Sequence, residues 1–123
     1  MKHEPRIFYA RWAPVTAGEY HPATNTIVVN LAVVDAVVRT TGHGGAVVQG
    51  AIVAHERAHA AAPSSWSRQQ EEAASRAAAV AAAGDVVVLA IEDVLRRTAA
   101  DGWRVGPSRA TGTNHRQAAA KWV

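Results

Sequence analysis

The order of apolar and polar positions predicts a small β-sheet in the first thirty residues. Residues 6–12 (RIFYARW) are rich in β-branched and aromatic side chains, which favour a strand. Residues 18–20 and 26–30 (TIVVN) are two further strand candidates, and residues 21–25 between them have the composition of a turn. We therefore expect a β-hairpin that is preceded by another strand.

The next segment is ambiguous, and a clear helical period follows it. The run LAVVDAVVRTT can form a helix that closes at Gly42, but its many valines also suit a strand. Residues 42–45 are predicted to be a loop. From Ala46 onward, one face of a helix is marked by residues in steps of four, three and four, namely Val48, Ile52, His55 and His59. Pro63 ends this helix.

Two more helices are predicted after a short connection. Ser67 and Gln70 form a capping-box pattern at the start of a helix over about residues 68–83, and Gly84 marks its end. Asp85 can cap a third helix, which ends before Gly102. Two oppositely charged pairs at i,i+4 spacing lie on its polar side, Glu92 with Arg96 and Asp93 with Arg97. The pattern indicates one helix-dominated α+β domain over residues 1–123 with a short twisted sheet.

Composition narrows the class of protein. Apolar residues make up 49% of the 123 residues, which allows a packed core, and the absence of cysteine excludes a disulfide framework and thiolate metal sites. No apolar run reaches the roughly 18–20 residues that span a bilayer, and the N-terminus has no apolar signal region. We therefore expect a cytoplasmic protein with no membrane partner. Abundant alanine, valine and arginine with little lysine suggest a GC-rich bacterial genome.

The net charge of +3 is unevenly distributed. No acidic residue follows Asp101, while four cationic residues do, namely Arg104, Arg109, Arg116 and Lys121. A solvated basic tail over residues 102–123 is the simplest interpretation of this run. The excess is too small to predict a nucleic-acid partner.

A His-Glu-x-x-His pattern stands in the helix that begins near Ala46. His55 and His59 lie one turn apart on its apolar face, where two imidazole nitrogens can bind one metal ion at roughly 2.0–2.1 Å. Glu56 lies about 100° further round the helix, so it is poorly placed as a ligand but can act as general base on a metal-bound water. The structural alternative is a pair of core histidines bonded to backbone carbonyls, with Glu56 in solvent.

A catalytic zinc ion needs a third protein ligand and an open fourth position. No Gly-x-x-His continuation follows His59, so the metzincin ligand set is absent, and the only later histidine is His115. Glu71 and Glu72 are closer, at the start of a helix that the short connection makes a neighbour. The residues alone leave both glutamates open, because either can be an ordinary acid at a helix N-terminus.

These motifs resemble those of the small gluzincin peptidases, and most of all the ImmA/IrrE-like metallopeptidases. That family has an HExxH helix, a short connection, and a helix that starts Glu-x-x-Ala-(Asp/Asn)-Arg; here HERAH is followed by EEAASRAAAVAAA. The resemblance places the third ligand at Glu71, with Ala74 and Arg76 matching the pattern. Ser75 stands where the family has a polar group that holds a ligand histidine. The resemblance covers about residues 18–83.

The resemblance implies a zincin-like domain, with the HExxH helix packed on a glutamate-bearing helix and one Zn²⁺ per chain. It implies zinc-dependent cleavage of a peptide bond in a specific protein or peptide substrate. The family's short sheet lines the cleft with its edge strand, and we expect TIVVN to be that edge. Tyr20, His43 and His115 are candidates to stabilise the oxyanion. Two alternatives stay open: a non-proteolytic metal enzyme, and a module that binds DNA or an acidic partner with its basic tail.

Overall fold

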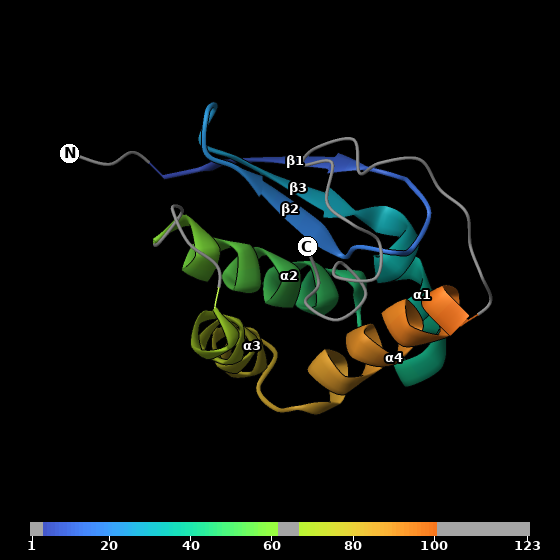
Figure 1. The fold of residues 1–123 in the computed structure, drawn as a ribbon. Helices are drawn as coiled ribbons and strands as arrows, with labels where there is room; N and C mark the ends of the chain where they lie inside the picture. The colour runs from blue at the N-terminus through green and yellow to red at the C-terminus, as the bar shows by residue number, and fades with distance from the viewer. Residues whose placement is uncertain (1–3, 62–66, 101–123) are drawn as a thin grey trace.

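The computed structural model describes residues 4–61 and 67–100. Within these ranges the chain is α+β, as the sequence predicts, and helices dominate (Figure 1). The elements in chain order are β1 (Arg6–Ala10), β2 (Gly18–His21), β3 (Thr26–Asn30), α1 (Leu31–Thr41), α2 (Gly45–Ala60), α3 (Arg68–Ala81) and α4 (Val86–Ala100). The predicted connection around Pro63, the helix end at Gly102 and the basic tail lie outside the described residues.

The sheet has the strand order β1-β3-β2, with β1 parallel and β2 antiparallel to β3. Val28 pairs with Phe8 on one side and with Glu19 on the other, so β3 is the central strand. The expectation that TIVVN forms the edge of the sheet is therefore wrong. The chain crosses over after β1, so that β1 pairs with one side of β3 and β2 pairs with the other. Strands β1 and β2 are therefore the two edges of the sheet.

The first strand is shorter than its sequence pattern suggests. It ends at Ala10, and the backbone N–H of Trp12 donates to Oδ1 of Asn30 instead of joining the ladder. The side-chain amide of Asn30 also donates to the carbonyl of Thr16 at 2.9 Å. One buried asparagine therefore holds the crossover loop against the end of β3.

Asn30 also decides the structure of the ambiguous valine-rich run. Its side chain accepts a hydrogen bond from the N–H of Ala32, which caps α1, and Gly42 ends that helix in the left-handed conformation with φ 77°. Three valines on one face are buried, namely Val33, Val34 and Val37. Two good caps and a buried face thus outweigh the strand preference of valine.

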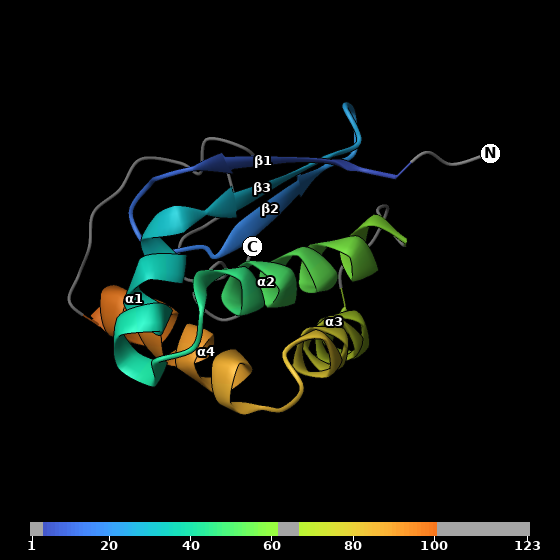
Figure 2. The ribbon, with the colours of Figure 1, turned by 180° about the vertical axis from the view of Figure 1, so that it is seen from behind.

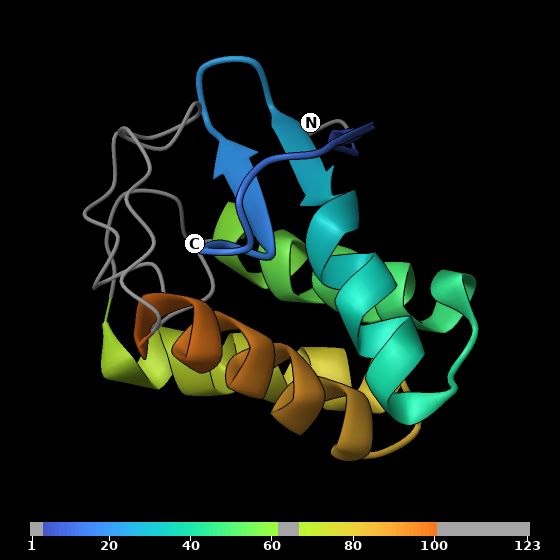
Figure 3. The same cartoon turned by 90° about the vertical axis from the view of Figure 1, so that its right-hand side faces the viewer.

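Helix α2 occupies the middle of the molecule. Figure 1 shows the sheet on one side of α2 and α3 on the other, and Figure 2 shows the same layers from behind. Helices α1 and α4 pack against each other and against one end of α2 (Figure 3). The core that joins these layers contains Ile27, Val29, Val33, Val37, Val48, Ile52, Ile91 and Leu95, all fully buried.

Helix α3 follows the predicted signals closely. Ser67 caps it by accepting a hydrogen bond from the N–H of Gln70 at 3.1 Å, as the capping-box pattern predicts. Ala74 and Ala78 are buried in the interface with α2, where their small side chains allow the two helices to pack closely. The helix ends at Ala81, two residues earlier than predicted. No helix in the described ranges is long and apolar enough to cross a bilayer.

Candidate metal centre

Three side chains from two helices converge between α2 and α3. Nε2 of His55 lies 3.1 Å from Oε1 of Glu71, and Nε2 of His59 lies 3.1 Å from Oε2 of the same carboxylate. The two Nε2 atoms are also 3.1 Å apart, and the imidazole rings meet edge to face. The ligand atoms of the group all lie within 4.8 Å of one another, so His55, His59 and Glu71 can hold a metal ion.

The separation of the two imidazole nitrogens is close to that of two ligands in a tetrahedral site. Ligands that lie about 2.0–2.1 Å from zinc at tetrahedral angles are separated from each other by about 3.3 Å. The two Nε2 atoms are 3.1 Å apart, and each lies 3.1 Å from a different oxygen of Glu71, while the ligand atoms as a set lie within 4.8 Å of one another. One ion could therefore contact both imidazoles and the carboxylate after small side-chain rotations.

The two histidines come together because of helix geometry, and Glu71 joins them because α3 docks on α2. His55 is fully buried, whereas the side chains of His59 and Glu71 keep 12% and 13% exposure. Solvent therefore reaches the cluster from the His59 and Glu71 side. Glu72, the other candidate from the sequence, is exposed on α3 and is not part of the group.

The electrostatics of the cluster keep Glu71 in the form that a metal needs. Burial by itself raises the pKa of Glu71, but hydrogen bonds and charge interactions with His55 and His59 outweigh burial and lower the pKa to about 2. Glu71 is therefore an ionised carboxylate at neutral pH. An anionic oxygen beside two imidazole nitrogens is a common ligand set for zinc.

Glu56 is buried in the same region, and its charge interaction with Glu71 shows that its carboxyl group lies near the cluster. Glu56 is fully buried, and neither carboxylate oxygen has a hydrogen-bond partner among the described residues. Burial raises its pKa well above the ordinary value, and the charges of Glu71 and Glu19 raise it further. The alternative in which Glu56 is solvated is therefore wrong. A buried carboxyl group without a partner is destabilising, so its presence calls for a functional explanation.

The edge strand β2 contacts α2 directly at Glu56. A β-carbon built on Gly18 would lie 2.8 Å from Cγ2 of Ile52 and 3.3 Å from Cγ of Glu56. It would also lie 3.2 Å from the carbonyl oxygen of Val28. Only glycine allows β2 to approach α2 this closely, so Gly18 determines the distance between the edge strand and the buried carboxyl group.

Sequence reasoning missed the importance of Gly18 and of Glu19. Glu19 is buried in β2, and burial raises its pKa to about 7. A glycine at the start of a strand usually indicates a turn, and a glutamate in a short strand is usually exposed to solvent. The only available signal was the acidic residue in a strand that precedes the motif helix.

The other predicted site residues lie in different places. The hydroxyl of Tyr20 donates to Oδ1 of Asn25 at 2.9 Å, within its own hairpin. His43 precedes α2, and ten helical residues separate the start of that helix from His55, a distance of about 15 Å along its axis. His115 lies outside the described residues.

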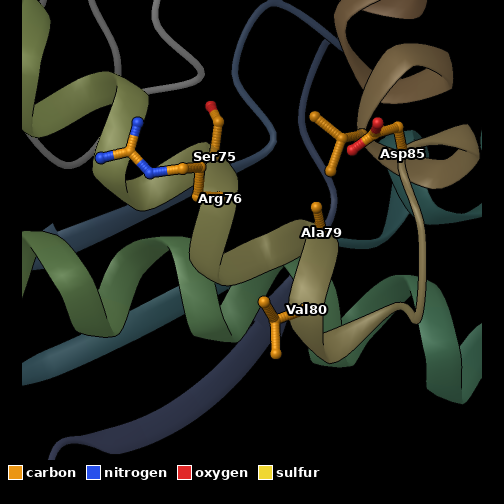
Figure 4. Close-up of a pocket in the computed structure, with 6 residues that line it drawn as sticks. Ser75, Arg76, Ala79, Val80 and Asp85 are labelled. Carbon is orange, nitrogen blue, oxygen red and sulfur yellow. The ribbon is translucent and has the colours of Figure 1, made fainter.

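Ser75 is one turn beyond Glu71 on α3. It lines a groove of about 340 Å³ between α3 and α4 (Figure 4). Within the described residues, no hydrogen bond joins Ser75 to either histidine. Its predicted role in holding a ligand histidine stays a prediction.

Comparisons of the chain with protein-family models, with curated proteins and with solved structures gave no match. The function is therefore inferred from the residues of the site and their geometry.

Proposed function

We propose that this protein is a zinc metallopeptidase of the gluzincin type, similar to the ImmA/IrrE-like enzymes, that cleaves a peptide bond in a specific protein or peptide. One observation carries the proposal. His55, His59 and Glu71 bring two imidazole nitrogens and a carboxylate together, with each nitrogen 3.1 Å from one oxygen of Glu71, and Glu56 is buried nearby with no hydrogen-bond partner among the described residues. The donor set of two imidazoles and one carboxylate is one that zinc prefers and that leaves a fourth position open.

Each residue has a defined task in this proposal. His55, His59 and Glu71 hold the ion, which when bound supplies a Lewis acid and lowers the pKa of a water ligand. Glu56 takes a proton from the attacking water and later delivers it to the leaving amine. The environment of Glu56 suits that task, because burial raises its pKa and makes it a stronger base than a solvated glutamate.

Among the described residues β2 is an edge strand, and this edge supports an extended peptide as substrate. Strand β2 forms the edge beside α2, and at Gly18 its backbone lies directly against Glu56. A peptide paired with β2 would therefore run past the general base, with main-chain hydrogen bonds giving affinity and side-chain pockets giving selectivity. This assigns to β2 the role that the sequence pattern suggested for TIVVN. We further propose that the enzyme acts in the cytoplasm.

The test compares Glu56→Gln with the wild-type protein. The variant is expected to keep its zinc and its fold but to lose at least about a hundredfold in the cleavage rate, because the amide cannot accept the proton. Zinc content is measured by elemental analysis, and cleavage is measured on a peptide library and on unfolded casein. Glu72→Gln is the matched control, since this exposed glutamate is outside the group, and it should cleave at the wild-type rate.

Three outcomes decide the matter. A few discrete products that disappear with a chelator support a selective peptidase. Wild-type turnover by Glu56→Gln would remove Glu56 from the mechanism. Stoichiometric zinc without cleavage of any peptide would contradict peptidase activity and leave the non-proteolytic metal enzyme as the better proposal.

A further inference from the structure

Exposed apolar side chains gather where α3 turns into α4. Val80 near the end of α3 is 82% exposed, and Val86 and Leu89 at the start of α4 are 60% and 58% exposed. Val80 also lines a groove of about 340 Å³, and Val86 and Leu89 directly follow two of its lining residues in the chain. The lining is Ser75, Arg76, Ala79, Val80, Asp85 and Val88 (Figure 4). We call these three side chains and the groove the α3–α4 patch. Apolar side chains clustered in this way commonly mark an interaction surface.

The α3–α4 patch has a shape and a charge pattern that complement themselves. Val80 lines the groove and is largely exposed, and the small side chain of Ala79 lines the groove beside it. Arg76 and Asp85 lie on opposite sides of this groove (Figure 4), and neither forms an ion pair with any described residue. A twofold rotation about the groove would place Val80 of each copy at the groove of the other. The same rotation would bring each Arg76 toward the Asp85 of the other copy.

We propose that the α3–α4 patch is the contact between two copies of this chain. A small ligand of one charge class would be attracted by one side of the groove and repelled by the other. A second copy instead presents its exposed Val80 to the apolar groove. It also presents Asp85 opposite Arg76 and Arg76 opposite Asp85, so that unlike charges face each other. The patch is independent of the proposed peptidase activity, because Val80 lies nine residues after Glu71, about 13 Å along α3.

The size of the patch sets the strength of the contact. Standard protein interfaces use roughly 20–30 residues on each side, and the α3–α4 patch offers far fewer. We therefore expect a weak dimer that forms as the protein concentration rises, and that weakens with added salt because the two Arg76–Asp85 pairs are screened.

The experiment is sedimentation equilibrium of the full chain from micromolar to millimolar concentration. Wild type should shift from monomer to dimer, and Val80→Glu should weaken the dimer at least about tenfold, because it places a charge in the apolar contact. Arg76→Glu and Asp85→Arg should each weaken it, and the double variant should restore it. Phe8→Glu is the control, since Phe8 is exposed on β1, which lies on the opposite side of α2 from α3, and it should leave the dimer unchanged.

The double variant, which exchanges the charges of residues 76 and 85, distinguishes a specific contact from general loss of charge attraction. All four substituted residues are exposed, so the variants should fold, and circular dichroism of each variant tests this. Recovery of the dimer only in the double variant supports the twofold contact. A monomer at every concentration, an unchanged dimer in Val80→Glu, or single charge reversals that the double variant does not rescue would each overturn the proposal.

Discussion

Replacing Gly18 by alanine tests whether the contact between β2 and α2 positions the general base. The new β-carbon would lie 2.8 Å from Cγ2 of Ile52 and 3.2 Å from the carbonyl oxygen of Val28, so the neighbouring groups must move. Overpacking of this kind destabilises a protein by about 1–3 kcal/mol. Loss of glycine freedom in the unfolded chain offsets about 0.4–1 kcal/mol. We therefore expect the free energy of unfolding to fall by about 1–2 kcal/mol.

The same substitution should reduce turnover while leaving zinc in place. The carbonyl of Val28 is held in the centre of the sheet and Ile52 is fully buried, so Glu56, with its Cγ 3.3 Å from the new atom, is pushed as well. A shift of about 1 Å in a catalytic group can reduce the rate by about a hundredfold. We expect kcat to fall by about tenfold or more with zinc content unchanged, because His55 and His59 project from α2 toward α3.

The assays are urea unfolding of the metal-free protein, elemental analysis, and turnover at saturating zinc. Ile52→Leu supplies a rescue, since leucine keeps the volume of isoleucine but has no γ2 methyl group. The double variant Gly18→Ala/Ile52→Leu should lose less stability than the sum of the single variants. Gly50→Ala is the matched control, because nothing lies within 4 Å of its added carbon. It should stabilise α2 by about 0.5–1 kcal/mol.

Three results would refute this reasoning about Gly18. One is wild-type stability in Gly18→Ala, which would mean that the contacts relax freely. Another is parallel loss of zinc and activity, which would place the damage at the ligands rather than at Glu56. The third is strict additivity in the double variant, which would remove Ile52 as the obstacle.

The remaining predictions concern the ligands and the pH dependence of stability. His55→Ala and His59→Ala should each abolish stoichiometric zinc binding, and full zinc in both variants would disprove the site. Glu71→Ala should lose most of the zinc affinity while Glu72→Ala keeps it, and titration with a competing chelator would reveal the reverse order. The pKa of Glu19 is raised from 4.5 to about 7, so the folded protein retains a proton between these pH values that the unfolded chain loses. Its contribution to stability is present below pH 4.5 and is lost by pH 7, on the order of 3 kcal/mol. Glu19→Gln should therefore gain stability relative to wild type as the pH rises through this window, and urea unfolding at several pH values measures this difference.

The parts of the fold that could be predicted depend on local sequence. The hairpin, α2 and α3 follow from turn residues, from a helical period and from the Ser67 cap, which each involve neighbours along the chain. The spacing of His55 and His59 fixes their proximity once the helix is accepted. The short connection to α3 then made a nearby glutamate a reasonable expectation.

The parts that could not be predicted depend on contacts between distant segments. Strand order is one example. Nothing in the residues of TIVVN reveals that β1 pairs with the side of this strand opposite to β2. The role of Asn30 is another, since its amide bonds loop carbonyls up to 17 residues away as well as capping α1. Gly18 and Glu19 acquire their importance only when β2 is placed on α2, so no local pattern could identify them.

The central position of α2 explains how one helix can provide both ligands and a buried base. A surface helix buries only one stripe of its side chains, whereas α2 is covered by α3 on one side and by the sheet on the other. His55 can therefore face Glu71 while Glu56 faces Gly18. Among the described residues the buried Glu56 carboxyl group has no hydrogen-bond partner, which is destabilising in the absence of metal. Because burial and the charges of Glu71 and Glu19 raise the pKa of Glu56, the penalty grows as the pH rises above the ordinary glutamate range. The Glu56→Gln variant that removes catalysis should accordingly make the metal-free protein more stable than wild type at pH 8. Urea unfolding at pH 5 and pH 8 measures this, and a variant that is less stable at pH 8 would show that the Glu56 carboxylate stabilises the fold rather than serving the site.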